Sequence, residues 1–373
     1  MSRSASVHLD ALRGAAALVV FAAHTRVLFF GGAASVVRNG PIRAGGWVLP
    51  NYLALSLGHQ AVIVFFVLSG LLVGGSVLRQ FAGGAFNWVD YLSARLTRLW
   101  VPLLPLLVIG GLLDLAAIHF FPGASTGYAA RRLGAEIFFG NVGFLQGIAV
   151  PYLGFNVPLW SLAFEWWFYV AFPLLLIAGR LQAKSVGAGV ILAALYIMVG
   201  PVIAFYFVLW CLGAAVAILP RRKLPAFVLP IAAGAFVVLN LVVRKLHLFP
   251  LAGDATLAAG AAGLCYVILH SAAPAGRLYT TAARFLARVS YTLYLAHFPI
   301  IFLLAQWLSV SLRPWPLDAL HGAAVAALLS AVFAVCWLLY LTFEARTDAV
   351  RALLCKAKME KAPGGRLTSP VNQ

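Results

Sequence analysis

The sequence has few charged residues for its length. Asp, Glu, Lys and Arg make up 10% of its 373 residues, where about 25% is usual in soluble globular domains, and hydrophobic residues make up 63% instead of about 45–50%. The mean hydropathy is +0.96. These values exclude a soluble globular domain and predict an integral membrane protein with several spans.

The apolar runs lack the alternation of apolar and polar residues that a transmembrane β-barrel needs, so an all-α membrane bundle remains. Runs of roughly 17–25 residues predict about ten transmembrane helices. They lie near residues 9–30, 58–78, 99–121, 158–178, 186–201, 202–219, 227–246, 252–270, 290–309 and 321–343. The division at Gly200-Pro201 is made because the apolar run there is too long for one helix.

Cysteine is scarce as well. The four cysteines form no close pair, so neither a disulfide framework nor a cysteine-based metal site is expected. The histidines outside the predicted site also lack the (i, i+4) spacing of metal ligands, and they are His8, His59, His119, His247, His270 and His321. We therefore expect no bound metal.

Acidic residues number only 10, against 27 Lys and Arg. In a soluble protein such an excess suggests nucleic-acid binding, but here the charged residues mostly flank the apolar runs, and no nucleic-acid partner is expected. Most Lys and Arg fall on the side of the two termini when ten spans are counted. The positive-inside rule therefore predicts a multi-pass protein of the cytoplasmic (inner) membrane, surrounded by membrane lipids, with both termini in the cytoplasm.

Residues 1–345 form one predicted transmembrane domain, because no internal repeat is evident and the ionisable residues of the first apolar run argue against a cleavable signal peptide. Residues 346–373 are predicted to be a basic, disordered cytoplasmic tail. In the longest outer connection, Leu133 to Phe144 is predicted to form a short interfacial or re-entrant helix.

Ionisable side chains inside spans are functional candidates, since they are costly in lipid unless they face a cavity or a partner. Asp10, Arg13 and His24 in the first span are separated by 3 and 11 residues, and at about 100° per residue they share one helix face. The helical rise puts Arg13 and His24 roughly 16 Å apart, with Arg13 at the cytoplasmic mouth.

Arg95 and Arg98 open the third span at the same mouth. Guanidinium groups suit phosphates, so these residues and Arg13 are candidates for binding a phosphorylated cytoplasmic donor. Alternatively, each arginine only determines topology, and for any single one of them this interpretation is favoured.

Glu165 in the fourth span lies at a depth similar to that of His24, so the two side chains are candidates for a pair in which the carboxylate orients the imidazole for general base catalysis. The alternative is a carboxyl group that is protonated or hydrogen-bonded for packing. Tyr294 and His297 share a face in the cytoplasmic half of the ninth span, where an anchoring role is favoured. Ser69 indicates close helix packing, and Glu344 is a candidate partner for a mouth arginine.

Five motifs follow the order of the spans. They are Leu9-Asp10-Ala11-Leu12-Arg13-Gly14 with His24; Phe65-Phe66-Val67-Leu68-Ser69-Gly70; Arg95 with Arg98; Trp160-Ser161-Leu162 with Glu165 and Tyr169; and Ser290-Tyr291-Thr292-Leu293-Tyr294-Leu295 with His297. In these motifs the chain resembles acyltransferase family three, ten-span bacterial membrane enzymes that O-acylate carbohydrates.

The resemblance implies a transmembrane acyltransferase domain over residues 1–345, acyl-CoA (by default acetyl-CoA) as donor substrate, and essential roles for Arg13 and His24. It also implies a hydroxyl acceptor on a carbohydrate or a lipid-linked sugar. Some members carry an additional outer hydrolase-like domain. It is absent here, so an acyl relay to such a domain would need a separate outer-face partner enzyme.

The resulting hypothesis has His24 and Glu165 as catalytic residues, and Arg13, Arg95 and Arg98 as ligands of the donor phosphates. Supporting roles fall to Asp10, Ser69, Tyr294 and His297. His24 acts as the base or as a transient acyl carrier, and the sequence does not separate the two. The alternatives are a transporter or flippase of a glycolipid or glycan precursor, and a structural membrane subunit.

Overall fold

The computed structural model describes residues 1–31, 57–179, 183–220, 222–245, 250–310, 314–316 and 318–360. Helices make up 82% of the structure, and the described part of the chain contains no β-strand. The prediction of an all-α membrane bundle is therefore confirmed.

Eight helical segments among the described residues are long and apolar enough to cross a membrane. They belong to α1 (Arg3–Phe30), α4 (Gly58–Ser69) with η1 (Gly70–Gly74) and α5 (Gly75–Ala82), α6 (Trp88–Phe120), η2 (Val157–Leu159) with α9 (Trp160–Ala178), α10 (Ala183–Val216), α12 (Pro250–His270), α13 (Arg277–Trp307) and α14 (Ala319–Thr342). A shorter apolar helix, α11, spans Val228–Lys245.

The long helix α10 is broken in the middle. Gly200 has φ 77° and ψ 175°, which lie outside the helical region, so α10 consists of two arms. The break predicted at Gly200-Pro201 is therefore present. When the two arms are taken separately and α11 is included, each of the ten predicted segments corresponds to a helical segment.

Two spans begin well before their predicted starts. The predicted spans 99–121 and 290–309 are parts of α6, which begins at Trp88, and of α13, which begins at Arg277. The side chain of Asn87 accepts two backbone hydrogen bonds from the first turn of α6 and so caps it. Hydropathy detects only the part of a helix that lies in hydrocarbon, whereas the helix itself continues to its cap.

The connection between α6 and α9 contains two short helices, α7 (Ala124–Ala130) and α8 (Ala135–Val142). The second corresponds to the short helix predicted within Leu133 to Phe144. The first was not predicted, because a helix of 7 residues that is rich in small side chains has no apolar periodicity to reveal it.

The prediction that residues 346–373 are disordered is wrong for their first part. After α14 the chain forms one 3₁₀ turn, η3 (Glu344–Arg346), and continues as α15 (Thr347–Glu360), while residues 361–373 lie outside the described residues. The hydroxyl of the buried Thr347 donates to the carbonyl of Glu344 at 2.7 Å, and α15 packs against α6. Composition alone does not reveal this tertiary contact, which orders a segment that is polar and basic.

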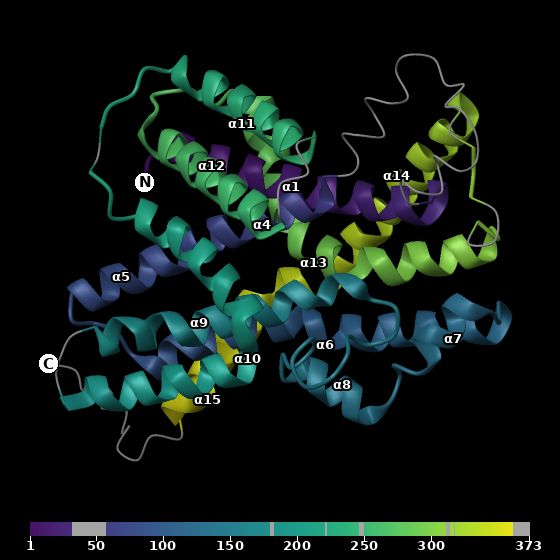
Figure 1. Ribbon diagram of the computed structural model, residues 1–373, viewed down its shortest axis with the longest axis horizontal. Coiled ribbons are helices and arrows are strands. Elements are labelled where there is room, and N and C mark those ends of the chain that lie inside the picture. The colour runs from purple at the N-terminus through teal and green to yellow at the C-terminus, as the bar shows by residue number, and fades with distance from the viewer. Residues whose placement is uncertain are drawn as a thin grey trace, which may run out of the picture.

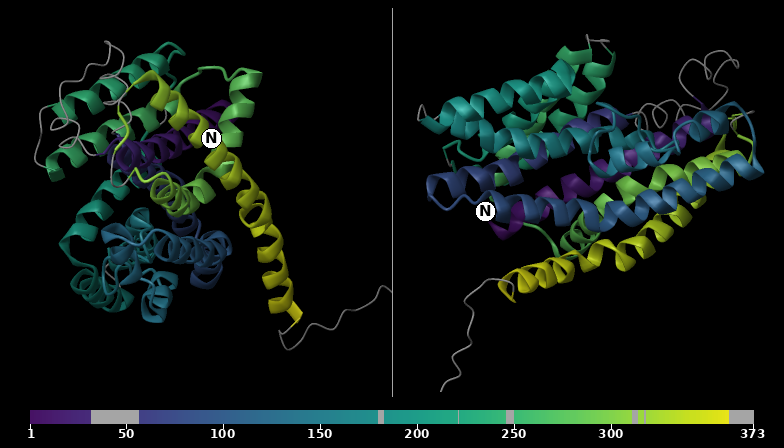
Figure 2. Two further views of the ribbon diagram at one scale, coloured as in Figure 1. Left: turned by 90° about the vertical axis from the view of Figure 1, so that its right-hand side faces the viewer. Right: turned by 90° about the horizontal axis from the view of Figure 1, so that it is seen from below.

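The helix α1 lies inside the bundle, packed along much of its length against α13 and also against α4 (Figure 1). We call the end of the bundle where α1, α6 and α13 begin the arginine end, and the opposite end the histidine end. The helices run largely side by side between these ends, and α14 continues through η3 into α15 along one edge (Figure 2).

Close packing of α4 and η1 against the second arm of α10 depends on glycine. A Cβ atom on Gly213 would lie 1.9 Å from the carbonyl oxygen of Val67, and one on Gly70 would lie 1.9 Å from that of Trp210. Small residues let transmembrane helices approach to backbone contact in this way. The segment Gly70–Gly74 is a π-helix, a local widening that often accompanies functional sites.

We expect Gly213→Ala to destabilise the bundle by about 1–3 kcal/mol, because the new methyl group must push two backbones apart. Gly187→Ala is the matched control in the same helix, since its Cβ would meet nothing within 4 Å. Thermal unfolding of the two purified variants in the same detergent measures the difference. Equal stability of the two variants would contradict the proposed contact.

Candidate functional site

Two histidines from neighbouring helices pair near the histidine end. Nδ1 of His24 lies 2.9 Å from Nε2 of His297, and the two rings are nearly parallel, with centroids 5.2 Å apart. Nδ1 of His297 lies 2.7 Å from the carbonyl oxygen of Leu293, which can only accept a hydrogen bond.

These contacts assign the protons of the neutral pair. His297 must carry its proton on Nδ1 to donate to Leu293, so its Nε2 is an acceptor. His24 must then donate from Nδ1, which leaves the lone pair of His24 on Nε2. The result is a histidine whose tautomer is fixed by a second residue and whose remaining nitrogen is a base.

The partner of His24 is therefore His297, where the sequence suggested Glu165. His24 lies in the second half of α1. His297 was expected near the start of its helix, and it lies instead in the second half of α13, because α13 starts at Arg277 and not near residue 290. Spacing within one helix shows which residues share a face, but it does not show which neighbouring helix that face meets.

Glu165 belongs to a second hydrogen-bonded group. The phenol of Tyr169, one turn away on α9, donates to the Glu165 carboxylate. Since that phenol has a single proton, the hydroxyl of Ser69 donates to the Tyr169 oxygen at 3.3 Å, and the indole N–H of Trp210 donates to Ser69 at 3.1 Å. Ser69, which the sequence marked as a packing residue, links three helices through polar contacts.

Tyr294 ties α13 to the start of α9. Its hydroxyl donates to the carbonyl of Pro158 at 2.6 Å and lies 2.5 Å from the hydroxyl of Ser161. The Tyr294 ring is 6.3 Å from that of His297, centroid to centroid. Tyr294 thus fixes the level at which α9 meets the histidine pair.

A cavity of about 350 Å³, which we call the inner cavity, lies between these groups and the arginine end. Its polar lining includes Arg13, Arg95, Arg98, Arg351, Ser69, Ser161, Glu165, Tyr169, Tyr291, Tyr294 and Asp348. Its apolar lining includes Val62, Phe65, Phe66, Leu68, Leu72 and Val73 from α4 and η1. The cavity therefore joins a cationic region to an apolar one.

At its inner end the cavity stops just short of the histidine pair. Phe65, Ser161 and Tyr294 line it there, and His24 is absent from the described residues that do so. Tyr294 is one helical turn from His297. A bound molecule must therefore displace or pass these side chains to reach His24.

Two of the predicted arginines are held by aromatic rings. The guanidinium of Arg95 lies 5.9 Å from the ring centroid of Tyr91 and 6.0 Å from that of Tyr169. Its Nε is buried and has no hydrogen-bond partner in the described part of the chain. The guanidinium of Arg98 lies 5.7 Å from the ring of Tyr291. An anion in the inner cavity would supply the acceptor that the Arg95 Nε lacks.

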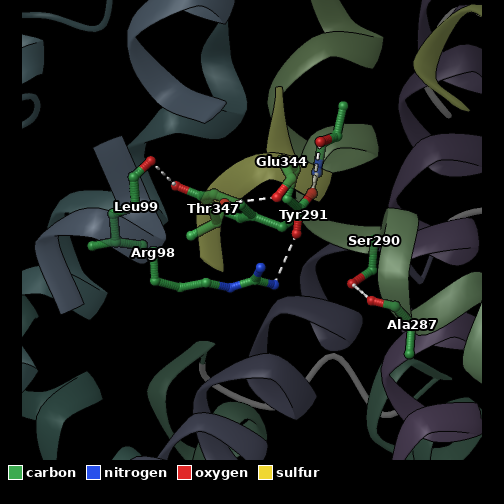
Figure 3. Close-up of polar contacts among 8 residues, drawn as sticks. Arg98, Leu99, Ala287, Ser290, Tyr291, Glu344 and Thr347 are labelled. Atoms are coloured by element: carbon green, nitrogen blue, oxygen red, sulfur yellow. Dashed lines mark hydrogen bonds and ion pairs between the residues drawn. The ribbon is translucent and has the colours of Figure 1, made fainter. Parts of the chain in front are cut away.

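Glu344 connects three segments at the arginine end (Figure 3). One carboxylate oxygen lies 2.8 Å from a nitrogen of Arg98, in the ion pair drawn in the figure. The other oxygen accepts hydrogen bonds from the backbone N–H and the hydroxyl of Thr292, at 3.0 and 2.6 Å. Glu344 was predicted to neutralise a mouth arginine, and this contact is present.

A second cavity, of about 470 Å³, opens beside the first, and we call it the mouth cavity. Asp10 lies here, together with Arg13 and with Arg284 and Arg288 of α13. Asp10 interacts electrostatically with all three arginines. The sequence indicated only a role in membrane orientation for Arg284 and Arg288. The spacing of residues within the first span does not show which other helix that span contacts.

The sequence left His59 unassigned, yet it contacts a buried carboxylate at the histidine end. Its Nε2 lies 2.9 Å from both oxygens of Asp254, and the hydroxyl of Tyr206 donates to Asp254 at 2.6 Å. Trp160 lies roughly parallel to the His59 ring, with centroids 6.4 Å apart. Four helical segments meet through these side chains. No three His, Cys, Asp or Glu residues of the described ranges are grouped as metal ligands would be.

The family model described as an acyltransferase domain matches residues 7–341, which is nearly the whole chain. No curated protein and no solved structure matches the chain. The family match ends before η3 and α15, and α15 nevertheless contributes Thr347, Asp348 and Arg351 to the inner cavity.

Glu344→Ala should lower the free energy of unfolding by about 2 kcal/mol, because Thr292 and Arg98 lose a buried charged acceptor and only the half-exposed Arg98 can turn to water. Glu344→Gln should fall between this variant and the wild type, since it keeps an acceptor for Thr292. Glu136→Ala, at an exposed position on α8, is the control. Chemical unfolding in detergent measures all three. A loss as small as that of the control would contradict the connecting role.

Proposed function

The chain belongs to acyltransferase family three and is a multi-pass membrane acyltransferase; from this premise we propose that it moves an acyl group, by default acetyl, from acyl-CoA to a hydroxyl of a carbohydrate or glycolipid. One observation carries the proposal. The inner cavity has arginines at one end and an apolar wall that leads toward the paired histidines.

The donor half of the proposal rests on charge. Coenzyme A carries phosphates at one end and the acyl thioester at the other, with a long, weakly polar arm between them. Arg13, Arg95 and Arg98 line the end of the cavity suited to phosphates. The thioester would then extend toward the histidine pair. Along α1 the eleven residues from Arg13 to His24 correspond to roughly 16 Å.

The chemical half rests on His24. We assign its Nε2 as the general base, because Nδ1 is committed to His297. The acceptor oxygen forms a bond to the thioester carbonyl carbon as its proton passes to Nε2. The carbon–sulfur bond then breaks, and the thiolate of coenzyme A takes the proton back from His24. In transfer through an acyl-imidazole, Nε2 attacks the thioester instead and the thiolate of coenzyme A leaves. The acceptor oxygen then attacks the acyl carbon, its proton passes to that thiolate, and the carbon–nitrogen bond to Nε2 breaks.

Glu165 has a different task in this proposal from the one that the sequence suggested. Its carboxylate is held by Tyr169 on the wall of the inner cavity, so we assign it to binding a polar group of either substrate. Tyr294 and Ser161 stand where the cavity approaches the histidines, and we assign them to positioning.

The orientation also belongs to the proposal. With the arginine end in the cytoplasm, where acyl-CoA is made, the termini face that side and the histidine pair lies toward the outer face. His59, Asp254 and Trp160 then lie on the acceptor side. An acceptor on a lipid carrier or on the outer surface of an inner membrane fits this arrangement.

His24→Ala should lower the rate of acyl transfer by about 10²–10⁴-fold, because no base then accepts the proton of the acceptor hydroxyl. His119→Ala, at an exposed position near the end of α6, should behave like the wild type. Mass spectrometry of surface glycans and lipid-linked sugars from cells with and without the gene measures the transfer and identifies the acceptor.

Retained acylation in a folded His24→Ala variant would remove His24 from the mechanism. A glycolipid that changes sides of the membrane without gaining acyl mass would favour the transporter alternative. Labelled acetyl-CoA supplied to proteoliposomes that contain the purified protein separates the two, because an enzyme releases coenzyme A when the acceptor is present.

His297→Leu should lower kcat by about 10²–10⁴-fold while the KM for acyl-CoA changes little, because His24 loses the acceptor that fixes its tautomer but the arginines are untouched. His297→Gln, which offers an oxygen acceptor, should recover part of kcat. Steady-state kinetics of these variants, compared at equal folded concentration, measure both constants. An equal rise in KM for both substitutions would indicate instead that His297 only shapes the binding site.

A further inference from the structure

Two arginines that line the mouth cavity, Arg284 and Arg288, have no role in the proposed donor site. The mouth cavity lies where α1, α13 and the segment from η3 into α15 meet. Its lining residues from α13 are Arg284, Ala287 and Arg288, and from α1 they are Asp10 and Arg13. The cavity is therefore a concave site with several guanidinium groups, which is the usual composition of a phosphate site.

Arg284 and Arg288 are four residues apart on α13, so they project from the same face of the helix. Ala287 between them is small and leaves room for a ligand. Arg284 is partly buried and Arg288 is exposed. Two guanidinium groups one turn apart can bind different oxygens of one phosphate group.

The acidic residues of the mouth cavity do not occupy these arginines. Glu344 is engaged by Arg98 and Thr292. Asp10 is near Arg284 and Arg288, and Asp348 also lines the cavity. No ion pair within 4 Å joins either arginine to an acid in the part of the chain that the structure describes. Donors on both arginines therefore remain available to a ligand.

The two cavities share part of their lining. Arg13, Arg98, Thr347 and Asp348 border both of them, so the cavities adjoin and one long ligand can occupy both. Coenzyme A has two separate anionic parts, the diphosphate at the base of its arm and a phosphate monoester on the 3′ oxygen of its ribose. A monoester bears more charge per phosphorus than either half of the diphosphate and is suited to paired arginines.

We propose that the mouth cavity binds the ribose 3′-phosphate of the donor through Arg284 and Arg288, while Arg13, Arg95 and Arg98 bind the diphosphate. This inference rests on the proposed function, and it divides the donor between two sites. It also gives the protein a way to select coenzyme A thioesters over acyl carriers that lack the 3′-phosphate.

The test compares two probes, coenzyme A and 3′-dephospho-coenzyme A, which differ only in that phosphate. Isothermal titration of the full chain in detergent should give at least tenfold tighter binding of coenzyme A. In the double variant Arg284→Ala/Arg288→Ala the two probes should bind equally, with the dephospho form within about twofold of its wild-type affinity. Arg277→Ala, at an exposed position of the same helix that borders neither cavity, should keep the tenfold preference.

The outcomes separate the two levels of the proposal. If the wild type prefers coenzyme A and the double variant keeps that preference, the 3′-phosphate site is elsewhere and the inference is overturned. Equal binding of both probes to the wild type overturns the inference but leaves the donor assignment intact. Binding of neither probe overturns the donor assignment itself. Should the double variant fail to fold, Arg288→Ala alone, at an exposed position, should still reduce the preference at least threefold, and an unchanged preference overturns the inference.

Discussion

An ionisable side chain inside a membrane bundle needs a partner, and this requirement organises the structure. Transfer of an unpaired charge into lipid costs several kcal/mol, so each such group brings elements together. Glu344 joins η3 to α6 and α13 through Arg98 and Thr292, and Asp254 joins α12 to α4 and α10 through His59 and Tyr206. These polar contacts determine which helices are neighbours, because lipid and apolar side chains are nearly equivalent surroundings for an apolar helix face.

Close backbone contact is the second constraint, and it brings polar side chains of neighbouring helices within hydrogen-bond distance. Ser69 can receive the indole N–H of Trp210 only because α4 and the second arm of α10 approach at Gly70 and Gly213. The π-helical segment begins directly after Ser69 and changes the register of α4 at that level. A tight glycine contact and a polar network are thus adjacent, and Ser69 also lines the inner cavity.

The helices and many of the site residues could be predicted from the sequence, but most of the pairings could not. Long apolar runs and Gly200 located the spans and the break in α10, and the positions of Arg13, Arg95 and Arg98 indicated one end of the bundle. Glu165 and His24 were expected at similar depth, yet each has a different partner. Ser161, one turn before Glu165 on α9, already meets Tyr294, one turn before His297, so Glu165 lies closer to the arginine end than the histidine pair does. The helix α15 escaped prediction since its order comes from contact with α6 and not from its composition.

The proton assignment of the histidine pair follows from one backbone carbonyl. Leu293 is one turn before His297 on α13, and its oxygen can only accept, so it fixes the proton of His297 on Nδ1. That choice makes Nε2 of His297 an acceptor, which in turn requires His24 to donate from Nδ1. In the proposed mechanism a neutral residue orients the base, where many hydrolases use a carboxylate, and a neutral partner adds no further charge to a bundle in which each charge must be compensated. This is a physical reason for Nδ1 of His24 to be hydrogen-bonded to a second histidine and not to Glu165.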